Sequence, residues 1–482
     1  MSLKSNHLFM HNYKQYTQQF KIVLLGKTSG IFLIICFWLM GATATAHHVN
    51  KTLPPDSTSS LLDQAAAAIM IENGKSDYKA GKVRNALIKF RQASVKDPFS
   101  WKAVYNISKC HYTLNNYGFA LKYAKKAMDL GAWKGDKEVY YLLGRAYHRL
   151  EIIDSALVNF QLAIDHLSKK RIKELQISKD MAQCEYARLV LAKRTKYMPV
   201  RMQGEMNSGF DDYGVVMADQ GNTMYFTSRR SNTTGGALNP DDQLFFEDVY
   251  KTTYNQIENE WSDATNQLGK LNSNGFESFN YIAPEGNYAV LTLNTTMTDA
   301  DNKTRVSDIC ITKKNKNGMW NTPKPIDNKT INTSFWDAAA TLTADGNTMV
   351  FVTDRKGEKS STDVYIVKKS GNNWGTAEPI KEINSKGAET TPFLTPDGKY
   401  LFFSSDGHQS MGGKDVFVSK NTNGKWSKPK NLGAGINTVN DDIFFVYDQE
   451  SGNAYISGYH IVGNKSSLDI FKIDMKEFSF PE

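Results

Sequence analysis

The sequence is poor in cysteine and histidine, with 4 cysteines and 9 histidines among 482 residues. The histidines show no His-Glu-x-x-His pattern or other metal-ligand spacing. No Gly-x-Ser-x-Gly motif is present, which argues against an α/β-hydrolase partner domain. Outside the N-terminal region Cys110, Cys184 and Cys310 are widely scattered, so we expect buried thiols rather than a disulfide framework. We therefore expect no catalytic residues, no cofactor and no metal.

The chain also lacks an apolar run at its N-terminus that is long enough to cross a bilayer comfortably. The run at 31–40 has about ten residues, whereas a membrane helix needs about twenty. Residues 1–29 contain four lysines and no acid, and small residues fill 41–46. This order predicts a secretory signal peptide over 1–46, with an uncleaved anchor as the alternative. Because Cys36 follows Ile35 rather than a small residue, we expect no lipidation.

A repeat of small residues follows the polar linker 47–60 and indicates an all-α region over 61–196. Three alanines recur at intervals of 34 and 36 residues, each with a second alanine seven residues later; they are Ala86, Ala120 and Ala156. In the first and third units a glycine stands twelve residues before this alanine and a phenylalanine four residues after it. The pattern resembles the tetratricopeptide repeat, in which small residues let two antiparallel helices pack closely. The charged segment 169–196 is expected to cap the stack.

A second repeat occupies residues 197–482 and predicts an all-β region. Five times the chain shows an Asn, a carboxylate five residues later, a Gly-centred turn, an apolar strand and an Asp-aliphatic pair. The turn glycines, spaced by 65, 60, 52 and 54 residues, are Gly221, Gly286, Gly346, Gly398 and Gly452. Several strands per unit at this period are typical of a β-propeller blade. Segment 197–202 matches 426–432 with one residue missing, so a strand near 198–202 is expected to close a five-bladed ring.

The five carboxylates that follow the repeated asparagines could form a ring of metal or sugar ligands. They are Asp212, Glu277, Asp337, Glu389 and Asp442. A residue present once in every blade is more simply a scaffold residue that bonds the backbone of its turn, and we expect this role. His408 lies in a Gly-rich blade loop and could touch a ligand, but an exposed loop histidine is the expectation.

Both repeats together carry a resemblance to a family. Residues 395–406 read Thr-Pro-Asp-Gly-Lys-Tyr-Leu-Phe-Phe-Ser-Ser-Asp, and 343–354 echo them. This sequence pattern resembles the TolB-type (WD40-like) propeller repeat. The additional Ile-Asn-Ser or Ile-Asn-Thr element at 331, 383 and 436 resembles the form found behind tetratricopeptide repeats in cell-envelope proteins of the Bacteroidetes, including the PorE-like component of the type IX secretion system.

The resemblance implies an exported protein in the periplasm or on the periplasmic face of the outer membrane. Its partners would be envelope proteins, such as outer-membrane or secretion-system components, and not nucleic acid. Relatives of this kind usually continue into an OmpA-like domain, whereas this sequence ends after the fifth blade, so direct peptidoglycan binding is not expected.

Charge divides between the two regions. Residues 60–198 hold 25 Lys and Arg against 13 acids, and residues 199–482 hold 28 against 36. Stacked helix pairs form a concave groove along the first helix of each unit, where such proteins commonly hold a peptide. The candidate partner-binding residues there are Lys102, Tyr105, Lys109 and Arg145, whereas Tyr147 falls on a core position. With only three units, the groove could instead rest on the propeller.

We therefore predict a multidomain chain, an all-α tetratricopeptide-repeat solenoid followed by an all-β five-bladed propeller. The predicted function is a non-catalytic protein–protein interaction scaffold of the cell envelope, and a type IX secretion or gliding assembly is the specific expectation from the resemblance. The alternative is a propeller that binds or hydrolyses glycans or peptides, with an accessory helical domain. Convergent acids and aromatic side chains from unlike blades in the central pocket would favour this alternative.

Overall fold

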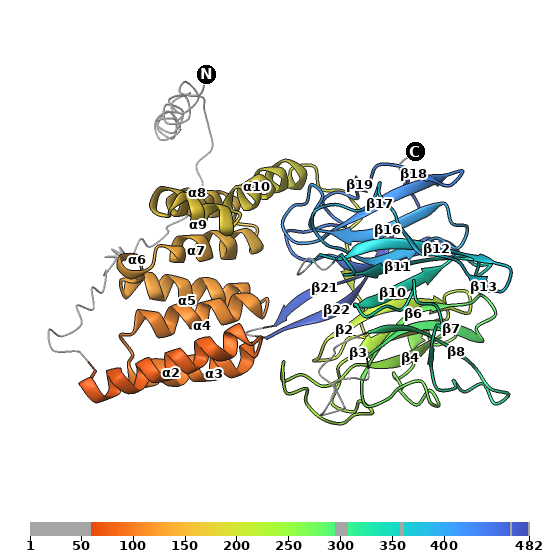
Figure 1. Cartoon of the computed structure of the whole chain (residues 1–482), viewed down its shortest axis with the longest axis horizontal. Coiled ribbons are helices and arrows are strands. Elements are labelled where there is room, and N and C mark those ends of the chain that lie inside the picture. Colours follow the sequence, from red (N-terminus) through yellow and green to blue (C-terminus); the bar gives the residue numbers. More distant parts are fainter. Residues whose placement is uncertain (1–58, 295–306, 357–360, 463–464, 481–482) are drawn as a thin grey trace, which may run out of the picture. The chain divides into compact units, whose positions relative to one another are not determined.

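The computed structural model describes residues 59–294, 307–356, 361–462 and 465–480. The predicted signal peptide, 1–46, and all but the last two residues of the linker, 47–60, lie outside these ranges. The described residues form a helical region followed by five β-sheets, as Figure 1 shows. No helix among them has both the length and the apolar character that a membrane span requires.

Nine helices are present in the described part of the N-terminal region. Their bounds are α2 (Leu61–Lys79), α3 (Val83–Lys96), α4 (Trp101–Thr113), α5 (Tyr117–Asp129), α6 (Ala132–Gly135), α7 (Glu138–Arg149), α8 (Ile153–His166), α9 (Lys169–Glu174) and α10 (Ile177–Leu191). Helix α2 packs on α3, α4 on α5, and α7 on α8, which gives three helix pairs. Serine N-caps start α2, α4 and α9, where each side chain accepts a backbone N–H of the first turn.

The small residues of the repeat lie where the two helices of a pair touch. A Cβ on Gly74 would come within 2.6 Å of the Phe90 ring, and a Cβ on Gly144 within 2.6 Å of the Phe160 ring. In the second pair Ser108 takes this place, and its hydroxyl donates a hydrogen bond of 2.6 Å to a backbone carbonyl of the facing helix. The tetratricopeptide prediction is confirmed, and the close approach explains why glycine stands at these positions.

The C-terminal region is a ring of five antiparallel sheets, each called a blade here. Blade 1 contains β2 (Asp212–Ala218), β3 (Thr223–Ser228), β4 (Asp248–Asn255) and β5 (Glu260–Trp261); blade 2 contains β6 (Phe276–Ile282), β7 (Tyr288–Asn294), β8 (Asp308–Lys313) and β9 (Lys324–Pro325). Blade 3 contains β10 (Asp337–Leu342), β11 (Thr348–Thr353), β12 (Asp363–Ser370), β13 (Asn373–Trp374) and β14 (Glu378–Pro379).

Blade 4 repeats this arrangement, and blade 5 ends the chain. Blade 4 contains β15 (Glu389–Leu394), β16 (Tyr400–Ser405), β17 (Asp415–Thr422), β18 (Lys425–Trp426) and β19 (Lys430–Asn431); blade 5 contains β20 (Ile443–Asp448), β21 (Asn453–Val462), β22 (Lys465–Asp474) and β1 (Val200–Arg201). The innermost strands β2, β6, β10, β15 and β20 each contact the next around the ring, and β20 contacts β2. The five-bladed propeller is therefore closed.

The closure takes place through the strand predicted near 198–202. In β1, Val200 pairs with Lys472 and Arg201 with Phe471, both in β22. The N–H of Met202 then donates to the carbonyl of Ile470 at 3.1 Å. A strand from just before the first blade thus forms the outer edge of the last blade, and no edge is left open between blades 1 and 5.

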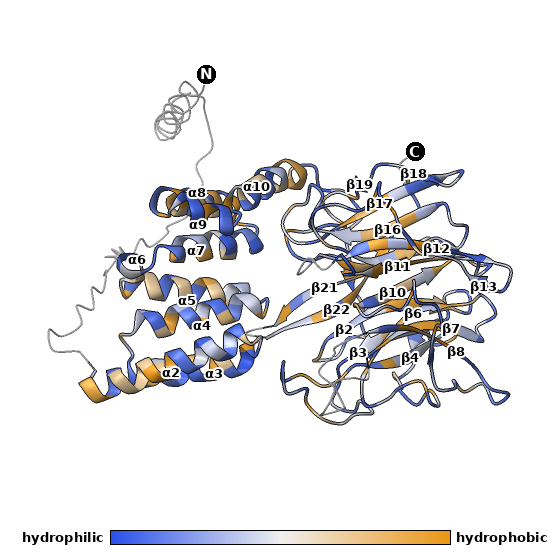
Figure 2. Ribbon diagram, in the orientation of Figure 1, coloured by the Kyte–Doolittle hydropathy of each residue, from blue (hydrophilic) through white to orange (hydrophobic). Residues whose placement is uncertain are grey.

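Apolar side chains form the cores between blades and between helices. Figure 2 shows that apolar and polar residues alternate along the strands and helices. One core cluster, for example, joins Val350 and Val364 of blade 3 to Leu401 and Phe417 of blade 4. Cys110, Cys184 and Cys310 are buried free thiols, as predicted. They line the cores and form no disulfide.

The last helix pair and the propeller share one core cluster. Met411 and Val439, from loops of blades 4 and 5, are fully buried in the same cluster as Cys184 of α10. His148 Nε2 donates a hydrogen bond of 2.7 Å to the carbonyl of Met411, and Arg149 Nη1 donates one of 2.5 Å to the carbonyl of Val439. The end of α7 is therefore fixed to the propeller. The candidate partner-binding cations Lys102, Lys109 and Arg145 take no part in this contact through an ion pair, and they form none with any other described residue.

Candidate partner-binding groove and axial pocket

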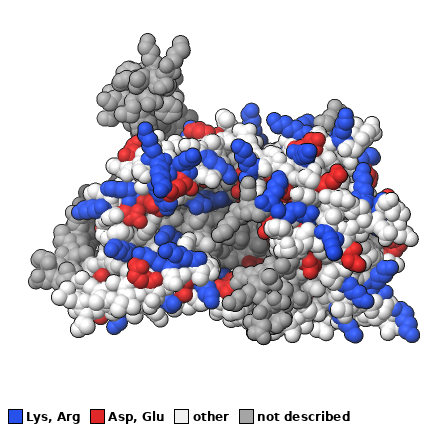
Figure 3. Space-filling model, viewed as in Figure 1, with Lys and Arg blue, Asp and Glu red and all other residues white. Residues whose placement is uncertain are grey.

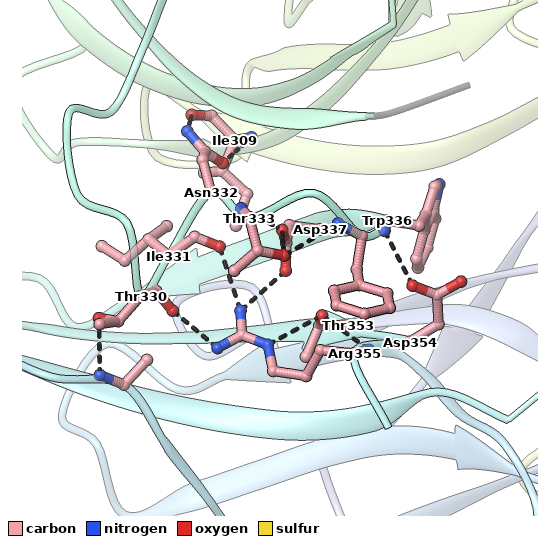
Figure 4. A network of polar contacts seen from close by, with 12 residues as sticks. Ile309, Thr330, Ile331, Asn332, Thr333, Trp336, Asp337, Thr353, Asp354 and Arg355 are labelled. Atoms are coloured by element: carbon pink, nitrogen blue, oxygen red, sulfur yellow. Dashed lines mark hydrogen bonds and ion pairs between the residues drawn. The ribbon is translucent and has the colours of Figure 1, made fainter. Parts of the chain in front are cut away.

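The repeated carboxylates belong to the scaffold, and blade 3 shows how they act. Figure 4 shows Asp337 accepting hydrogen bonds from the backbone N–H and the hydroxyl of Thr333, at 2.7 and 2.6 Å, and pairing with Arg355 at 2.8 Å. The preceding Asn332 accepts from the N–H of Ile309 at 2.7 Å and donates to its carbonyl at 2.9 Å. Each Asn therefore fixes a strand of the preceding blade, and each carboxylate fixes the entry of its own inner strand.

The same contacts recur in all five blades. The Ser or Thr after the Asn bonds to the carboxylate in every case: Ser208 to Asp212, Ser273 to Glu277, Thr333 to Asp337, Ser385 to Glu389 and Thr438 to Asp442. The expected structural role is confirmed, and within the described residues no group of three or more acids, histidines or cysteines could hold a metal. Burial without a cationic partner raises the pKa of Glu277 to about 8, whereas Asp337 has Arg355 beside it.

His408 is not the exposed loop histidine that the sequence predicts. Its Nε2 lies 2.7 Å from the carbonyl oxygen of Ile383, and its ring packs 5.2 Å from the ring of Phe417. The prediction is wrong because the loop folds back over its own blade and toward the preceding Ile-Asn-Ser turn. His408 is therefore a half-buried structural residue.

On the helical region, the predicted partner-binding residues include two cations that lie against aromatic rings. Lys109 Nζ is 5.2 Å from the ring centre of Tyr105 and 5.6 Å from that of Tyr78. Tyr105 is buried and Tyr78 half-buried, and the hydroxyl of Tyr78 is 2.7 Å from that of Thr113. Burial lowers the pKa of Lys109. The rings come from α2 and α4, so the ammonium group lies between two first helices.

Arg145 has a similar setting one helix pair further along the groove. Its guanidinium carbon is 4.4 Å from the ring centre of Tyr112 on α4 and 5.6 Å from that of Tyr141 on α7. The Tyr141 hydroxyl donates a hydrogen bond of 3.0 Å to the carbonyl of Leu175, which fixes the ring. The charge of Asp180 acts on Arg145, but the two side chains form no ion pair. Aromatic rings thus hold both cations in place.

The remaining predicted residues differ in their exposure. Lys102 is exposed, with its Nζ 5.8 Å from the ring centre of Trp101. Tyr147 packs against two core clusters, in line with its predicted core position. Figure 3 shows many Lys and Arg side chains over the helical region on the face drawn. We define the concave groove as Lys102, Tyr105, Lys109 and Arg145 together with Tyr78, Tyr112 and Tyr141.

The propeller has a pocket where the inner strands of its blades meet, which we call the axial pocket. Its volume is about 400 Å³. Four aromatic side chains from four blades line it, namely Tyr213, Phe276, Trp336 and Phe444. The polar wall consists of neutral side chains, including Ser278, Asn280, Thr292 and Ser307, and one carboxyl group, Glu247. Burial raises the pKa of Glu247, and the charge of Arg229 opposes this rise.

The described residues of the pocket wall supply one carboxyl group, which restricts the chemistry that they can support. Hydrolysis of glycosidic bonds ordinarily uses two carboxyl groups, about 5 to 10 Å apart on opposite sides of the bond. Of the five repeated carboxylates, none lines this pocket, because each is bonded within its own blade. A ligand-binding or hydrolytic propeller was expected to show both aromatic side chains and acids from unlike blades in its central pocket. In the described residues the aromatic side chains converge in this way, but the acids do not.

Sequence reasoning identified Tyr105 but not the other tyrosines of the groove, Tyr78, Tyr112 and Tyr141, nor the pocket residues. Tyr105, Lys109 and Tyr112 follow at intervals of four and three residues, which places them on one face of α4 and could have been read as a stripe. Trp336 stands directly before the repeated carboxylate of blade 3, at a position where the other blades have no Trp. This break in the repeat was the available signal for the pocket.

Comparison with known proteins finds solved structures that align with parts of this chain at low sequence identity and low TM-score. No family model matches the chain, and no curated protein sequence matches it. The first tetratricopeptide domain of Spaghetti (RPAP3) bound to an HSP90 peptide aligns at 20% identity and a TM-score of 0.22, over 25% of this chain and 95% of that one.

Two likenesses concern the propeller. A putative TolB from Agrobacterium tumefaciens aligns at 14% identity and a TM-score of 0.33, over 56% of this chain and 79% of that one. The α-L-arabinofuranosidase PaAbf62A from Podospora anserina, in complex with cellotriose, aligns at 10% identity and a TM-score of 0.36, over 58% of this chain and 97% of that one. Each of these likenesses covers one part of this chain and concerns its fold alone.

Proposed function

We propose that this chain is a non-catalytic scaffold of the cell envelope whose concave groove binds an acidic, extended segment of a partner protein. The observation that carries the proposal is the placement of Lys109 and Arg145. Each cation lies against two tyrosine rings, and neither forms an ion pair with a described residue. Both positive charges are therefore available to a carboxylate of a ligand.

The geometry supports a preformed site. A lysine in water loses considerable rotamer freedom when it binds, at a cost of up to about 2 kcal/mol. Stacking on rings already restricts Lys109 and Arg145, so less of that freedom remains to be lost. Groups that are ordered before the ligand arrives favour recognition of a segment without rearrangement of the scaffold. The exposed Lys102 would add attraction at the edge of the groove.

The envelope location rests on the predicted signal peptide, residues 1–46, and on the resemblance to envelope proteins of the Bacteroidetes. In this proposal the chain is exported to the periplasm or the periplasmic face of the outer membrane. There it would join envelope proteins in a type IX secretion or gliding assembly. Nucleic acid and peptidoglycan are not proposed as ligands.

The absence of catalysis is part of the same proposal. The described residues that line the axial pocket include one carboxyl group, Glu247, and this supports the proposal because glycoside hydrolysis commonly needs two. The competing function, hydrolysis of glycans or peptides by the propeller, predicts turnover of such substrates. An assay of the full chain on plant and bacterial polysaccharides and on casein would detect this turnover, and activity lost on Glu247→Gln would overturn the non-catalytic assignment.

The groove is tested by fluorescence anisotropy on the full chain. The probe is a short fluorescein-labelled peptide with several glutamates, and its matched control carries glutamine at the same positions. We expect binding of the acidic peptide, and a loss of roughly tenfold or more in affinity for each of Lys109→Glu and Arg145→Glu. Lys126→Glu makes the same charge change on the exposed side of α5 and should leave the affinity nearly unchanged.

Two outcomes of this experiment would contradict the groove assignment. Equal binding of the glutamate and glutamine peptides would show that charge is not recognised. An equal loss in Lys126→Glu and Lys109→Glu would show that only net charge matters. Export is tested separately, by fractionation of cells followed by detection of the chain with its N-terminus sequenced; recovery in the cytoplasm with residues 1–46 attached would refute it.

A further inference from the structure

The axial pocket breaks the symmetry of the propeller, and this break is the starting point of the inference. Four large aromatic side chains, each from a different blade, line it: Tyr213, Phe276, Trp336 and Phe444. A pocket of about 400 Å³ lies within the size range of small-molecule sites. We propose that the axial pocket binds a neutral sugar, either a single pyranose or the terminal residue of a glycan.

Trp336 is the largest side chain among the described residues that line the pocket. Its backbone N–H donates a hydrogen bond of 2.8 Å to Asp354, and Figure 4 shows its indole directed away from the network around Asp337 and Arg355. Within the described part of the chain, the indole N–H has no hydrogen-bond partner. A ring that is fixed at its backbone and free at its N–H offers both an apolar face and a donor to a ligand.

The polar wall has unused hydrogen-bonding capacity. Asn280 Oδ1 accepts a hydrogen bond of 2.7 Å from Thr292, but its amide nitrogen reaches only Ser278, at 3.5 Å. The hydroxyl of Ser307, which is 4% exposed, has no partner among the residues described. Ser278, Asn280 and Ser307 all line the pocket. A few polar groups placed on a pocket wall in this way can bond the hydroxyl groups of a ligand and fix its orientation.

The backbone at the floor of the pocket is shaped for this purpose at some cost. Each inner strand has a bulge, and in blades 3, 4 and 5 the bulged residue has a positive φ: 52° at Ala339, 46° at Thr391 and 56° at Phe444. A positive φ is unfavourable for these residues, most of all for a bulky one such as Phe444. Bulges redirect side chains, and strained residues of this kind concentrate at ligand sites. All three line the pocket.

The charges around the pocket favour a neutral ligand. Among the described residues that line it there is no Lys, Arg or His, so none of these side chains offers an anion a cation to pair with. The one acid among the described lining residues, Glu247, feels the positive charge of Arg229. The guanidinium of Arg229 lies 5.8 Å from the ring centre of Phe276, which disfavours a ligand cation at the same ring. Hydroxyl and amide groups beside aromatic faces match the C–H faces and hydroxyl groups of a pyranose.

The test is isothermal titration calorimetry on the full chain. The probes are glucose, galactose, xylose and N-acetylglucosamine, with glucuronate and a Lys-rich peptide as charged comparisons. We expect saturable binding of at least one neutral sugar and none of the charged probes. Trp336→Ala should lower the affinity at least tenfold, and Trp336→Phe, which keeps an aromatic face but removes the N–H, by less.

Matched variants separate the pocket from the rest of the chain. Trp133→Ala removes an exposed tryptophan of α6 and should leave sugar affinity unchanged, as should the groove variant Lys109→Glu. If Trp336→Ala does not fold, Asn280→Ala takes its place as the test. This variant removes a polar group at the bulge of blade 2 and should weaken sugar binding. Failure of all four neutral sugars to bind at tens of millimolar would overturn the proposal. The proposal would also be overturned if sugar binding survived both Trp336→Ala and Asn280→Ala, or if the Lys-rich peptide bound in the pocket and no neutral sugar did.

Discussion

The two regions of the molecule use repeated polar residues in opposite ways. In the propeller, every repeated carboxylate is bonded within its own blade, as Asp337 is to Thr333 and Arg355. In the helical region, Lys109 and Arg145 occur in single helix pairs, rest on tyrosine rings and have no ionic partner among the described residues. The comparison teaches that the carboxylates repeated in every blade maintain the scaffold, whereas Lys109 and Arg145 have no counterpart of this kind, as the proposed groove requires.

The largest expected effect comes from breaking one of the repeated propeller networks. Asp337→Ala removes the acceptor of Thr333 and leaves the half-buried Arg355 unpaired. Removing one partner of a buried ion pair costs about 3 to 5 kcal/mol, so we expect a loss of this size in the free energy of unfolding, measured by urea denaturation.

A control in the same blade sharpens this prediction. Asp345→Ala changes a carboxylate in the exposed Gly346 turn, where Asp345 accepts hydrogen bonds from Thr343 and Asn347. Its loss should cost about 1 kcal/mol. Equal losses in the two variants would mean that the repeated carboxylate is not a special part of the scaffold.

Within the propeller, blades 2 and 3 differ in whether the carboxylate has a cation. Burial raises the pKa of Glu277 to about 8, above the value of about 4.3 expected in the unfolded chain. Between these pH values the folded chain retains a proton that the unfolded chain has released. This group therefore makes stability fall as the pH rises from about 5 to 8, by about 2 to 4 kcal/mol.

Glu277→Gln should remove this contribution. The variant keeps an oxygen that can accept the hydrogen bond from Ser273 but does not titrate. Urea denaturation at pH 5 and pH 8 should show a smaller fall in stability than in the parent chain, and the variant should be the more stable protein at pH 8. Parallel pH profiles for the two chains would show that Glu277 is ionised in the fold at neutral pH.

The contact between the regions gives the next effect. Arg149 donates to the carbonyl of Val439 at 2.5 Å, and beside it His148 is held by Met411. Burial lowers the pKa of His148 to about 4, so its hydrogen bond is made by the neutral ring near pH 7. Arg149→Met removes a charged donor and should cost about 1.5 to 3 kcal/mol.

The readout is the thermal unfolding of both regions, followed by far-UV circular dichroism for the helices and tryptophan fluorescence for the propeller. We expect the two transitions to coincide in the parent chain and to move together to lower temperature in Arg149→Met. Lys125→Met, a residue of α5 whose cation lies over Tyr147, is the control and should shift the midpoint less. Transitions that are separate already in the parent chain would show that the shared core cluster does not couple the regions.

The fold followed from the sequence because both regions repeat. Glycine at 74 and 144 marked the close helix approaches, and the match of 197–202 to a later strand marked the closure of the ring. Repetition also identified the carboxylates as structural. Each of these signals is local, since a residue type at a fixed interval reflects a constraint that every unit shares.

The candidate sites were harder to predict because their residues meet only in the folded chain. Tyr78 and Tyr105 hold Lys109 from two different helices, so no spacing in the sequence reveals the contact. At the bulges, positive φ occurs at Thr391 and Phe444 rather than at glycine, and the usual sequence signal is missing. The burial of His408 likewise depends on how its loop packs.

The smallest expected effect on stability concerns the helical region, where the comparison predicts that a groove cation contributes little to the fold. Lys109→Met removes a cation that is held by two rings, and such interactions contribute about 0.5 to 1 kcal/mol at accessible sites. Its pKa is lowered by burial, so the charge itself is not favoured by the fold and an apolar side chain of similar length should fill the space. Urea denaturation should therefore show a change within about 1 kcal/mol. In the same preparation, affinity for the glutamate peptide should fall clearly. A loss of stability comparable to that of Asp337→Ala, with peptide affinity unchanged, would mean that Lys109 serves the scaffold as the propeller carboxylates do.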